Sequence, residues 1–258
     1  SGCNVGLSLS LFQSSKVSLE WGGIGPSSMQ TLASGVGAVF AGGTRDWLVT
    51  LDLDVAFGME ESGAIRAEGA RRLAGVLGEC TALEYLNLRG NAIGAEGTGR
   101  LAEVLGGCTA LAHLNLRGNE IRAVGARRLA TGLVKCKALV HLNLSSNGVG
   151  AEGASRLAEV LGQCKVLAYL DLGFNAIGAA GAQRMAEVLG ECMVLAHLDM
   201  TSNEIAPHGA ASLAGVLGKC KALEHLSLEF NGIGAGGAGR LAGVLGECKA
   251  LAHLDLQN

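Results

Sequence analysis

The chain has 258 residues, a formal net charge of −3 and 49% hydrophobic residues, a proportion that excludes an intrinsically disordered protein. It contains no run of the ~18 apolar residues that a transmembrane helix needs, and its charge gives no general reason to bind nucleic acid. Only 3% of the residues are aromatic and 41 are glycine, so the composition predicts a core of small aliphatic side chains at regular positions.

The segment 1–82 is predicted to form irregular repeats that cover one end of the fold, as terminal repeats of solenoids often do. The alternating leucines from Leu48 fit a strand, and the apolar spacing that follows, up to Leu77, fits a loop and a helix. This unit is longer than the later ones, by an insertion near positions 56–62. Positions 17–36 resemble a further degenerate repeat, and positions 5–12 are a candidate for one more strand.

From Leu83 onward the chain repeats with a constant period, because the same pattern begins again at Leu111 and at Leu139. Six full repeats occupy positions 83–250 without insertion or deletion, and positions 251–258 form a partial terminal repeat. Each repeat opens with the pattern LxxLxLxxN, whose alternating leucines predict a short strand with one buried face. The pattern GAxRLAxVLGxC follows, in which Leu101 and Leu105 have helical spacing.

A single strand and helix cannot bury their own apolar faces, so stacked repeats should form a solenoid. Strands stack at ~4.8 Å and helices at ~8–10 Å, so the stack should bend with its strands on the inner curve. The sequence therefore predicts an α/β fold in one domain over positions 1–258. We expect a right-handed horseshoe with a parallel sheet on the concave face and helices on the convex face.

The strand pattern, followed by Ile93, Gly97, Leu101, Leu105 and Cys108, resembles the leucine-rich repeat. The repeat length and the helical second half resemble its ribonuclease-inhibitor-like subfamily, which is shared with Ran GTPase activators and the sensor arms of NOD-like receptors. The resemblance implies the fold and says little about function. Ribonuclease inhibition is disfavoured, because such inhibitors alternate two repeat types and use concave tryptophans, whereas these repeats are uniform and contain no tryptophan.

Two columns of the repeat are predicted to be structural. Seven of the eight cysteines recur once in each repeat at the expected helix ends, where a free thiol packs well in the core. No CxxC pair suggests zinc, and free thiols favour a reducing intracellular compartment, the cytoplasm or an organelle. The asparagine that ends each strand pattern should turn inward and pair loop amides. The columns are Cys80, Cys108, Cys136, Cys164, Cys192, Cys220 and Cys248, and Asn91, Asn119, Asn147, Asn175, Asn203 and Asn231.

The third strand position gathers five of the six histidines and both tyrosines, and alternation places it on the concave side. One interpretation is a binding surface that responds to pH where histidines are adjacent; the other is a repeat consensus whose rings stack along the sheet. A metal site is disfavoured, because a linear ladder gives no tetrahedral cluster. The column consists of Tyr85, His113, His141, Tyr169, His197, His225 and His253.

The fifth and seventh strand positions vary between repeats, and such variation usually marks the recognition surface of a repeat protein. Arg89 and Arg117 make the first part of this face basic. Phe174 and Phe230 are candidate anchors at the eighth position, with packing against a neighbouring loop as the alternative. Acidic residues of the later repeats should form a patch that attracts a basic partner segment, with random drift as the alternative. They are Asp171, Asp199, Glu224, Glu229 and Asp255.

No HExxH, GxSxG or P-loop motif is present, and the glycine-rich segment at Gly232 is a repeat loop rather than a nucleotide site. We therefore predict a non-enzymatic protein without cofactor or metal that binds protein partners through the concave sheet and its loops. The alternatives are a structural subunit of a large assembly and a GTPase-activator-like regulator. The strand at positions 251–256 has a neighbour on one side only, so we expect further chain or another subunit to cover it.

Overall fold

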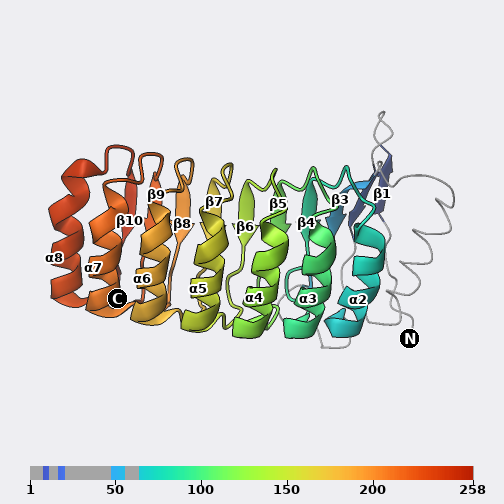
Figure 1. Ribbon diagram of the computed structural model, residues 1–258, viewed down its shortest axis with the longest axis horizontal. Coiled ribbons are helices and arrows are strands. Elements are labelled where there is room, and N and C mark those ends of the chain that lie inside the picture. The colour runs from blue at the N-terminus through green and yellow to red at the C-terminus, as the bar shows by residue number, and fades with distance from the viewer. Residues whose placement is uncertain (1–7, 12–16, 21–47, 56–63, 258) are drawn as a thin grey trace.

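The computed structural model describes residues 8–11, 17–20, 48–55 and 64–257, which form one sheet and one layer of helices (Figure 1). The strands are β1 (Ser8–Leu11), β2 (Val17–Glu20), β3 (Leu48–Asp52), β4 (Tyr85–Asn87), β5 (His113–Asn115), β6 (His141–Asn143), β7 (Tyr169–Asp171), β8 (His197–Asp199), β9 (His225–Ser227) and β10 (His253–Asp255). The helices are α2 (Arg66–Leu77), α3 (Gly94–Leu105), α4 (Arg122–Leu133), α5 (Gly150–Leu161), α6 (Gly178–Leu189), α7 (Ala206–Leu217) and α8 (Gly234–Val244), followed by the 3₁₀ turn η2 (Leu245–Glu247).

The strands lie in the sheet in the order of the sequence, and the helices stand side by side along one of its faces (Figure 1). Every pair from β2 to β10 is parallel, which confirms the predicted α/β solenoid. The exception is β1, which pairs with β2 antiparallel. Only positions 12–16 separate these two strands, and a parallel crossover needs about a dozen residues or more.

The register between neighbouring strands advances by one repeat length, so equivalent residues become direct neighbours. His113 pairs with His141, and Leu114 pairs with Leu142. Each column of the repeat therefore becomes a row across the sheet. The face of the sheet that is turned away from the helices carries the third and fifth strand positions and is called the open face below.

The core lies between the sheet and the helices and is built almost entirely from repeated aliphatic residues. Leu86 and Leu88 of one repeat are fully buried, as are Leu101 and Leu105 of the helix that follows. Gly97 shows how closely neighbouring helices approach, because a Cβ atom there would lie 2.9 Å from the Cβ of Ala70. The small residues that the composition shows therefore serve the helix contacts, while leucines fill the layer beneath the sheet.

The cysteine column lies just beyond the helices rather than at their last residues. Helix α3 ends at Leu105, and Cys108 follows in the next turn, so the predicted helix end was one turn too late. Within the described residues, none of the seven repeat cysteines forms a disulfide, and all are buried except Cys192 and Cys248, which are half-buried. The Cys108 thiol lies 3.2 Å from the carbonyl oxygen of Leu77 in the preceding repeat, and burial raises its pKa to about 12.

The asparagine column turns inward, as predicted, and links successive repeats. The side-chain amide of Asn91 donates to the carbonyl oxygens of Leu53 and Arg89 at 2.8 and 3.0 Å. Its backbone N–H donates to the side-chain oxygen of Asn119 at 3.1 Å. Because these backbone groups are buried and out of reach of water, the asparagine column supplies the hydrogen-bond partners that they need.

Some sequence predictions fall outside the described residues, namely the insertion at positions 56–62, positions 21–36 of the degenerate repeat at 17–36, and Cys3. Among the helices that the structure describes, none has both the length and the apolar character that a membrane crossing requires.

Candidate protein-binding face

The rings of the third strand position form a continuous row on the open face. The tightest contacts surround Tyr169, whose ring centroid lies 3.9 Å from that of His141 and 4.4 Å from that of His197, in nearly parallel planes. His225 and His253 stack at 4.4 Å. At the other end the rings are tilted, with 6.0 Å between Tyr85 and His113. The stacking interpretation is therefore realised in the structure. The stacked rings cover one another's faces, so the row presents mainly ring edges to a ligand, with His113 and His253 the most exposed of its members.

The stack changes the protonation of its imidazoles. Burial lowers the pKa of His141, and the neighbouring His113 and His197 lower it further. The pKa of His197 is lowered by burial and by His225, although Asp199 and Asp171 oppose the shift. Both imidazoles are therefore neutral at pH 7, and the middle of the row is an uncharged aromatic strip.

Asp171 departs from the surface role that its column predicts. Only 7% of this residue is exposed, and it accepts hydrogen bonds from the side-chain amide of Asn143 and the backbone N–H of Gly173, both at 2.9 Å. Burial raises the pKa of its carboxyl group. Asp171 therefore supports the end of its strand more than it adds to an accessible acidic patch.

The basic region at the start of the face is smaller than the sequence suggests. Arg89 lies 3.8 Å from the carboxylate of Asp54, and both side chains are about one-third exposed. Asp54 occupies the seventh position of the irregular strand pattern that begins at Leu48, so continuing the column through that repeat would have found it. Arg117 is half-buried in the next repeat, and its backbone N–H donates to the side-chain oxygen of Asn115 at 3.0 Å.

The open face is hollowed over its last three strands, β8 to β10. This hollow, called the acidic hollow below, has a volume of about 400 Å³. Its described lining contains three imidazoles and three carboxylates and neither lysine nor arginine. The lining residues are His197, Asp199, Thr201, His225, Leu226, Ser227, Glu229, His253, Leu254 and Asp255.

Two carboxylates of the acidic hollow interact directly. The hydrogen bond to Asp255 raises the pKa of Glu229, with further contributions from burial and from the charges of Asp255 and Asp199. The pKa of Asp255 is lowered, first by the backbone N–H of Gln257 and then by Glu229. The proximity of the two carboxylates thus makes it harder to ionise both of them.

Two further observations complete this end of the face. The hydroxyl groups of Thr201 and Ser227 lie 2.8 Å apart in a hydrogen bond that the sequence analysis did not anticipate. Glu224 precedes β9 and is exposed, but it is not among the described lining residues of the acidic hollow. Within the described residues, no group of three or more histidine, cysteine, aspartate or glutamate side chains is arranged to hold a metal ion.

Phe174 and Phe230 stand at the exit of strands β7 and β9, and both side chains are exposed. Their exposed fractions are 55% and 58%. Their backbones adopt φ angles of 58° and 52°, in the left-handed region that bulky residues rarely enter. The structure therefore places both candidate anchors at the surface, beside the turn that leads from the sheet to the helices.

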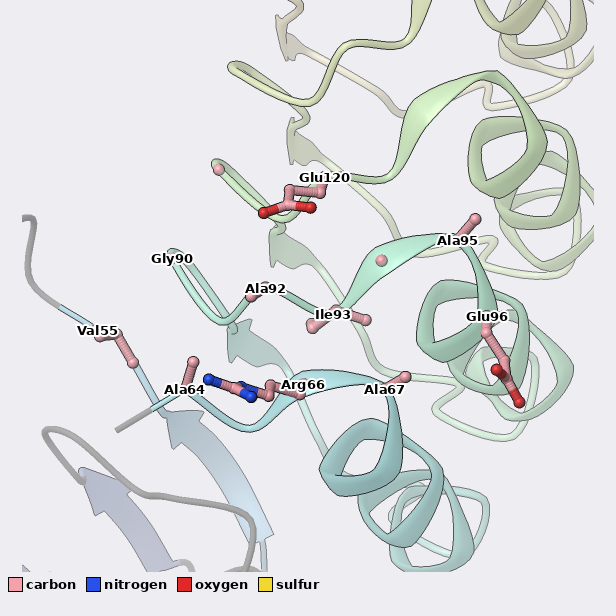
Figure 2. Close-up of a pocket in the computed structure, with 12 residues that line it drawn as sticks. Val55, Ala64, Arg66, Ala67, Gly90, Ala92, Ile93, Ala95, Glu96 and Glu120 are labelled. Carbon is pink, nitrogen blue, oxygen red and sulfur yellow. The ribbon is translucent and has the colours of Figure 1, made fainter. Parts of the chain in front are cut away.

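A second cavity, of about 580 Å³, lies where the turns of the first repeats meet the starts of α2 and α3 (Figure 2). Its wall is mostly backbone and small side chains, including Gly90, at which a Cβ atom would lie 2.5 Å from the carbonyl oxygen of Val55. Arg66 extends along its turn toward Ala64, and Glu96 points away from it (Figure 2). The cavity thus brings together no set of groups suited to catalysis among its described lining residues.

A parallel sheet that carries one helix per strand and leaves one face open defines a repeat solenoid. The leucine-rich repeat family model matches residues 79–102, 107–130, 135–158, 163–186, 191–214 and 219–242, so the chain belongs to the leucine-rich repeat family. The ribonuclease-inhibitor-like subfamily stays a prediction.

The search of curated proteins finds no match. Among solved structures, the chain is similar to one titled "Leiomodin-1 Actin-Binding Site 2 (ABS2)", with 18% sequence identity and a TM-score of 0.49. The match covers 59% of this chain and 88% of that one.

Proposed function

We propose that this protein is a non-catalytic binding module whose open face takes up a basic segment of a partner protein. The observation that carries the proposal is the acidic hollow over β8 to β10, where carboxylates and flat imidazole rings line one depression. Leucine-rich repeats are solenoids whose variable, exposed strand positions suit recognition, and the hollow coincides with such positions.

The charges of the acidic hollow favour a cationic ligand. The pKa of Glu229 is raised by its interaction with Asp255, so ionising both carboxylates costs free energy. A lysine or arginine side chain placed between them would offset that repulsion and gain charge-assisted hydrogen bonds. Asp199 of the neighbouring strand would add a third negative charge.

The imidazole row suits the same ligand. A guanidinium group is planar and stacks on aromatic faces while it binds carboxylates at its edge. The rings of His197, His225 and His253 stack on one another, with centroids 5.3 and 4.4 Å apart, so a ligand meets their edges and the exposed ring of His253. An arginine could contact this exposed ring and the acids together, and this favours arginine over lysine as the main recognised residue.

A fluorescently labelled peptide of alternating arginine and glycine tests the proposal. We expect it to bind the wild-type protein, and the double variant Asp199→Asn, Glu229→Gln to bind it at least ten-fold more weakly. Binding should also weaken as salt rises, because exposed charges are screened beyond ~8 Å at physiological ionic strength.

The matched control is the double variant Glu103→Gln, Glu159→Gln, which removes two negative charges from the helices. These glutamates pair with Arg100 and Arg156 at 3.5 and 2.9 Å on the opposite layer of the fold. The control should bind the peptide as the wild type does. Equal loss in both variants would show that net charge, and not the acidic hollow, attracts the peptide, and that result would overturn the proposal.

A further inference from the structure

The residue at the eighth strand position has a left-handed backbone in every regular repeat, whatever its side chain. Its backbone N–H donates to the carbonyl oxygen of the seventh position in the next repeat, for example from Ser146 to Gly173 and from Phe174 to Thr201, both at 2.8 Å. The buried asparagine follows directly. The φ angles are 71° at Gly90, 66° at Gly118, 57° at Ser146, 58° at Phe174, 53° at Ser202 and 52° at Phe230.

The repeat architecture therefore imposes this backbone conformation, which is the same for glycine, serine and phenylalanine. Glycine adopts it without steric cost, and the first two regular repeats have glycine there. Phenylalanine is strained in it, because its Cβ approaches the backbone. Stability alone would favour glycine at Phe174 and Phe230.

Packing does not offset this strain. More than half of each ring is exposed, at 55% for Phe174 and 58% for Phe230. A bulky residue that occupies a strained backbone conformation and whose side chain is also exposed is typical of a binding residue, because strained positions cluster where ligands are held. Exposed aromatic side chains also dominate the binding energy of many protein interfaces.

The two phenylalanines are two repeats apart, and the position between them is Ser202. At ~4.8 Å for each strand, their backbones are separated by about 10 Å along the edge of the open face. In the polyproline II conformation, which has three residues per turn, apolar side chains at positions i and i+3 lie on the same face and span about 9 Å, at ~3.1 Å per residue. The small serine leaves the space between the rings free for the peptide backbone.

The charges around the pair indicate what else the partner carries. Phe230 follows Glu229 of the acidic hollow directly, and the exposed Glu204 lies just beyond Ser202 in the chain. An acidic apolar segment would be repelled here, and an uncharged one would gain no electrostatic attraction. A segment with basic residues would be attracted by both Glu229 and Glu204.

We propose that Phe174 and Phe230 form a two-point apolar anchor for an extended, basic partner segment that carries apolar side chains at every third position. This inference rests on the proposed function and adds the apolar half of the recognition. It also predicts an unusual pair of effects, since removing either ring should stabilise the protein and weaken binding.

The first experiment measures stability. Phe174→Gly and Phe230→Gly should each raise the melting temperature by about 2–4 °C, because the left-handed strain is released. Ser146→Gly and Ser202→Gly are matched controls, which release the same strain without removing a ring. A fall in melting temperature for the phenylalanine variants alone would show that the rings stabilise the fold, and would overturn the inference.

The second experiment measures binding with two labelled peptides, one with leucine at every third position and arginine elsewhere, and one with serine in place of leucine. We expect the leucine peptide to bind the wild type at least ten-fold more tightly than the serine peptide. The double variant Phe174→Gly, Phe230→Gly should lose that difference and keep the weaker binding. The double variant Ser146→Gly, Ser202→Gly should retain the full preference.

The outcomes separate the two proposals. If the leucine peptide binds the phenylalanine double variant as tightly as the wild type, the anchor is wrong while the acidic hollow stands. If neither peptide binds the wild type, the proposed function fails, and the anchor fails with it. Phe174→Asn with Phe230→Asn gives a second test, since asparagine also tolerates the left-handed conformation; it must reproduce the loss of preference.

Discussion

The backbone N–H of Asn119 donates to the side-chain oxygen of Asn147, one repeat further along the chain, at 2.8 Å. The side-chain amide of Asn147 in turn donates to the carbonyl oxygens of Leu116 and Leu144 at 2.9 and 2.8 Å. One buried side chain thus pairs groups from two repeats. The asparagine column joins neighbouring repeats in the same way that the strands do, through hydrogen bonds at right angles to the chain.

We predict that Asn147→Ala lowers the free energy of unfolding by more than about 3 kcal/mol. The substitution leaves several buried backbone groups without partners, and each such group costs ~1–3 kcal/mol. Urea unfolding followed by circular dichroism measures the loss. Asn115→Ala is the control, because Asn115 is half-buried and accepts from the Arg117 N–H; its cost should be about 1 kcal/mol. Equal costs would contradict the inward role of Asn147.

The cysteine column should resist thiol reagents in the folded protein. Burial raises the pKa of Cys108 to about 12 and that of Cys136 to about 11, and the thiolate is the reactive form. At pH 8 we expect a chromogenic disulfide reagent to react slowly before denaturation and fully after it. The half-buried Cys192 and Cys248 should react first. Rapid reaction at Cys108, located by mass spectrometry, would show that the core opens readily.

The ring row should make stability depend on pH. The pKa of His141 is lowered in the folded state by burial and by His113 and His197, so the unfolded chain binds protons more readily. The contribution of the neutral His141 to the free energy of unfolding is therefore complete above the ordinary histidine pKa, and it is lost as pH decreases from about 7 toward 5. His141→Phe keeps a ring in the row without a titrating group. Urea unfolding at pH 7 and pH 5 should show a smaller difference for this variant than for the wild type.

Binding of the arginine–glycine peptide should weaken over the same pH range. As pH falls, His197 gains a positive charge, and Glu229, whose pKa is raised by its hydrogen bond to Asp255, loses its negative charge more readily than an ordinary glutamate. Both changes oppose a cationic ligand. Fluorescence anisotropy at pH 7.5 and pH 5.5 measures the change, and the variant Glu229→Gln should show a smaller one. Tighter binding at pH 5.5 would place the peptide outside the acidic hollow.

The sequence by itself determined the architecture, because a single constant period repeats its strand, turn and helix without interruption from Leu83 to Ala250. A repeat with this regularity has only one way to bury its leucines, which is to stack on copies of itself. The inward asparagines and the buried cysteines could be predicted for the same reason, since each of these residues lies beside the equivalent residue of the next repeat.

The open face required the tertiary structure, because exposure depends on what each neighbouring strand places beside a residue. Asp171 shares a column with Asp199 and Asp255, yet Asn143 and the Gly173 backbone enclose it. Arg89 forms an ion pair with Asp54, which belongs to an irregular repeat of different length. The depression over β8 to β10 and the left-handed backbones of Phe174 and Phe230 likewise arise from contacts between repeats, which a one-dimensional pattern of residue types does not contain.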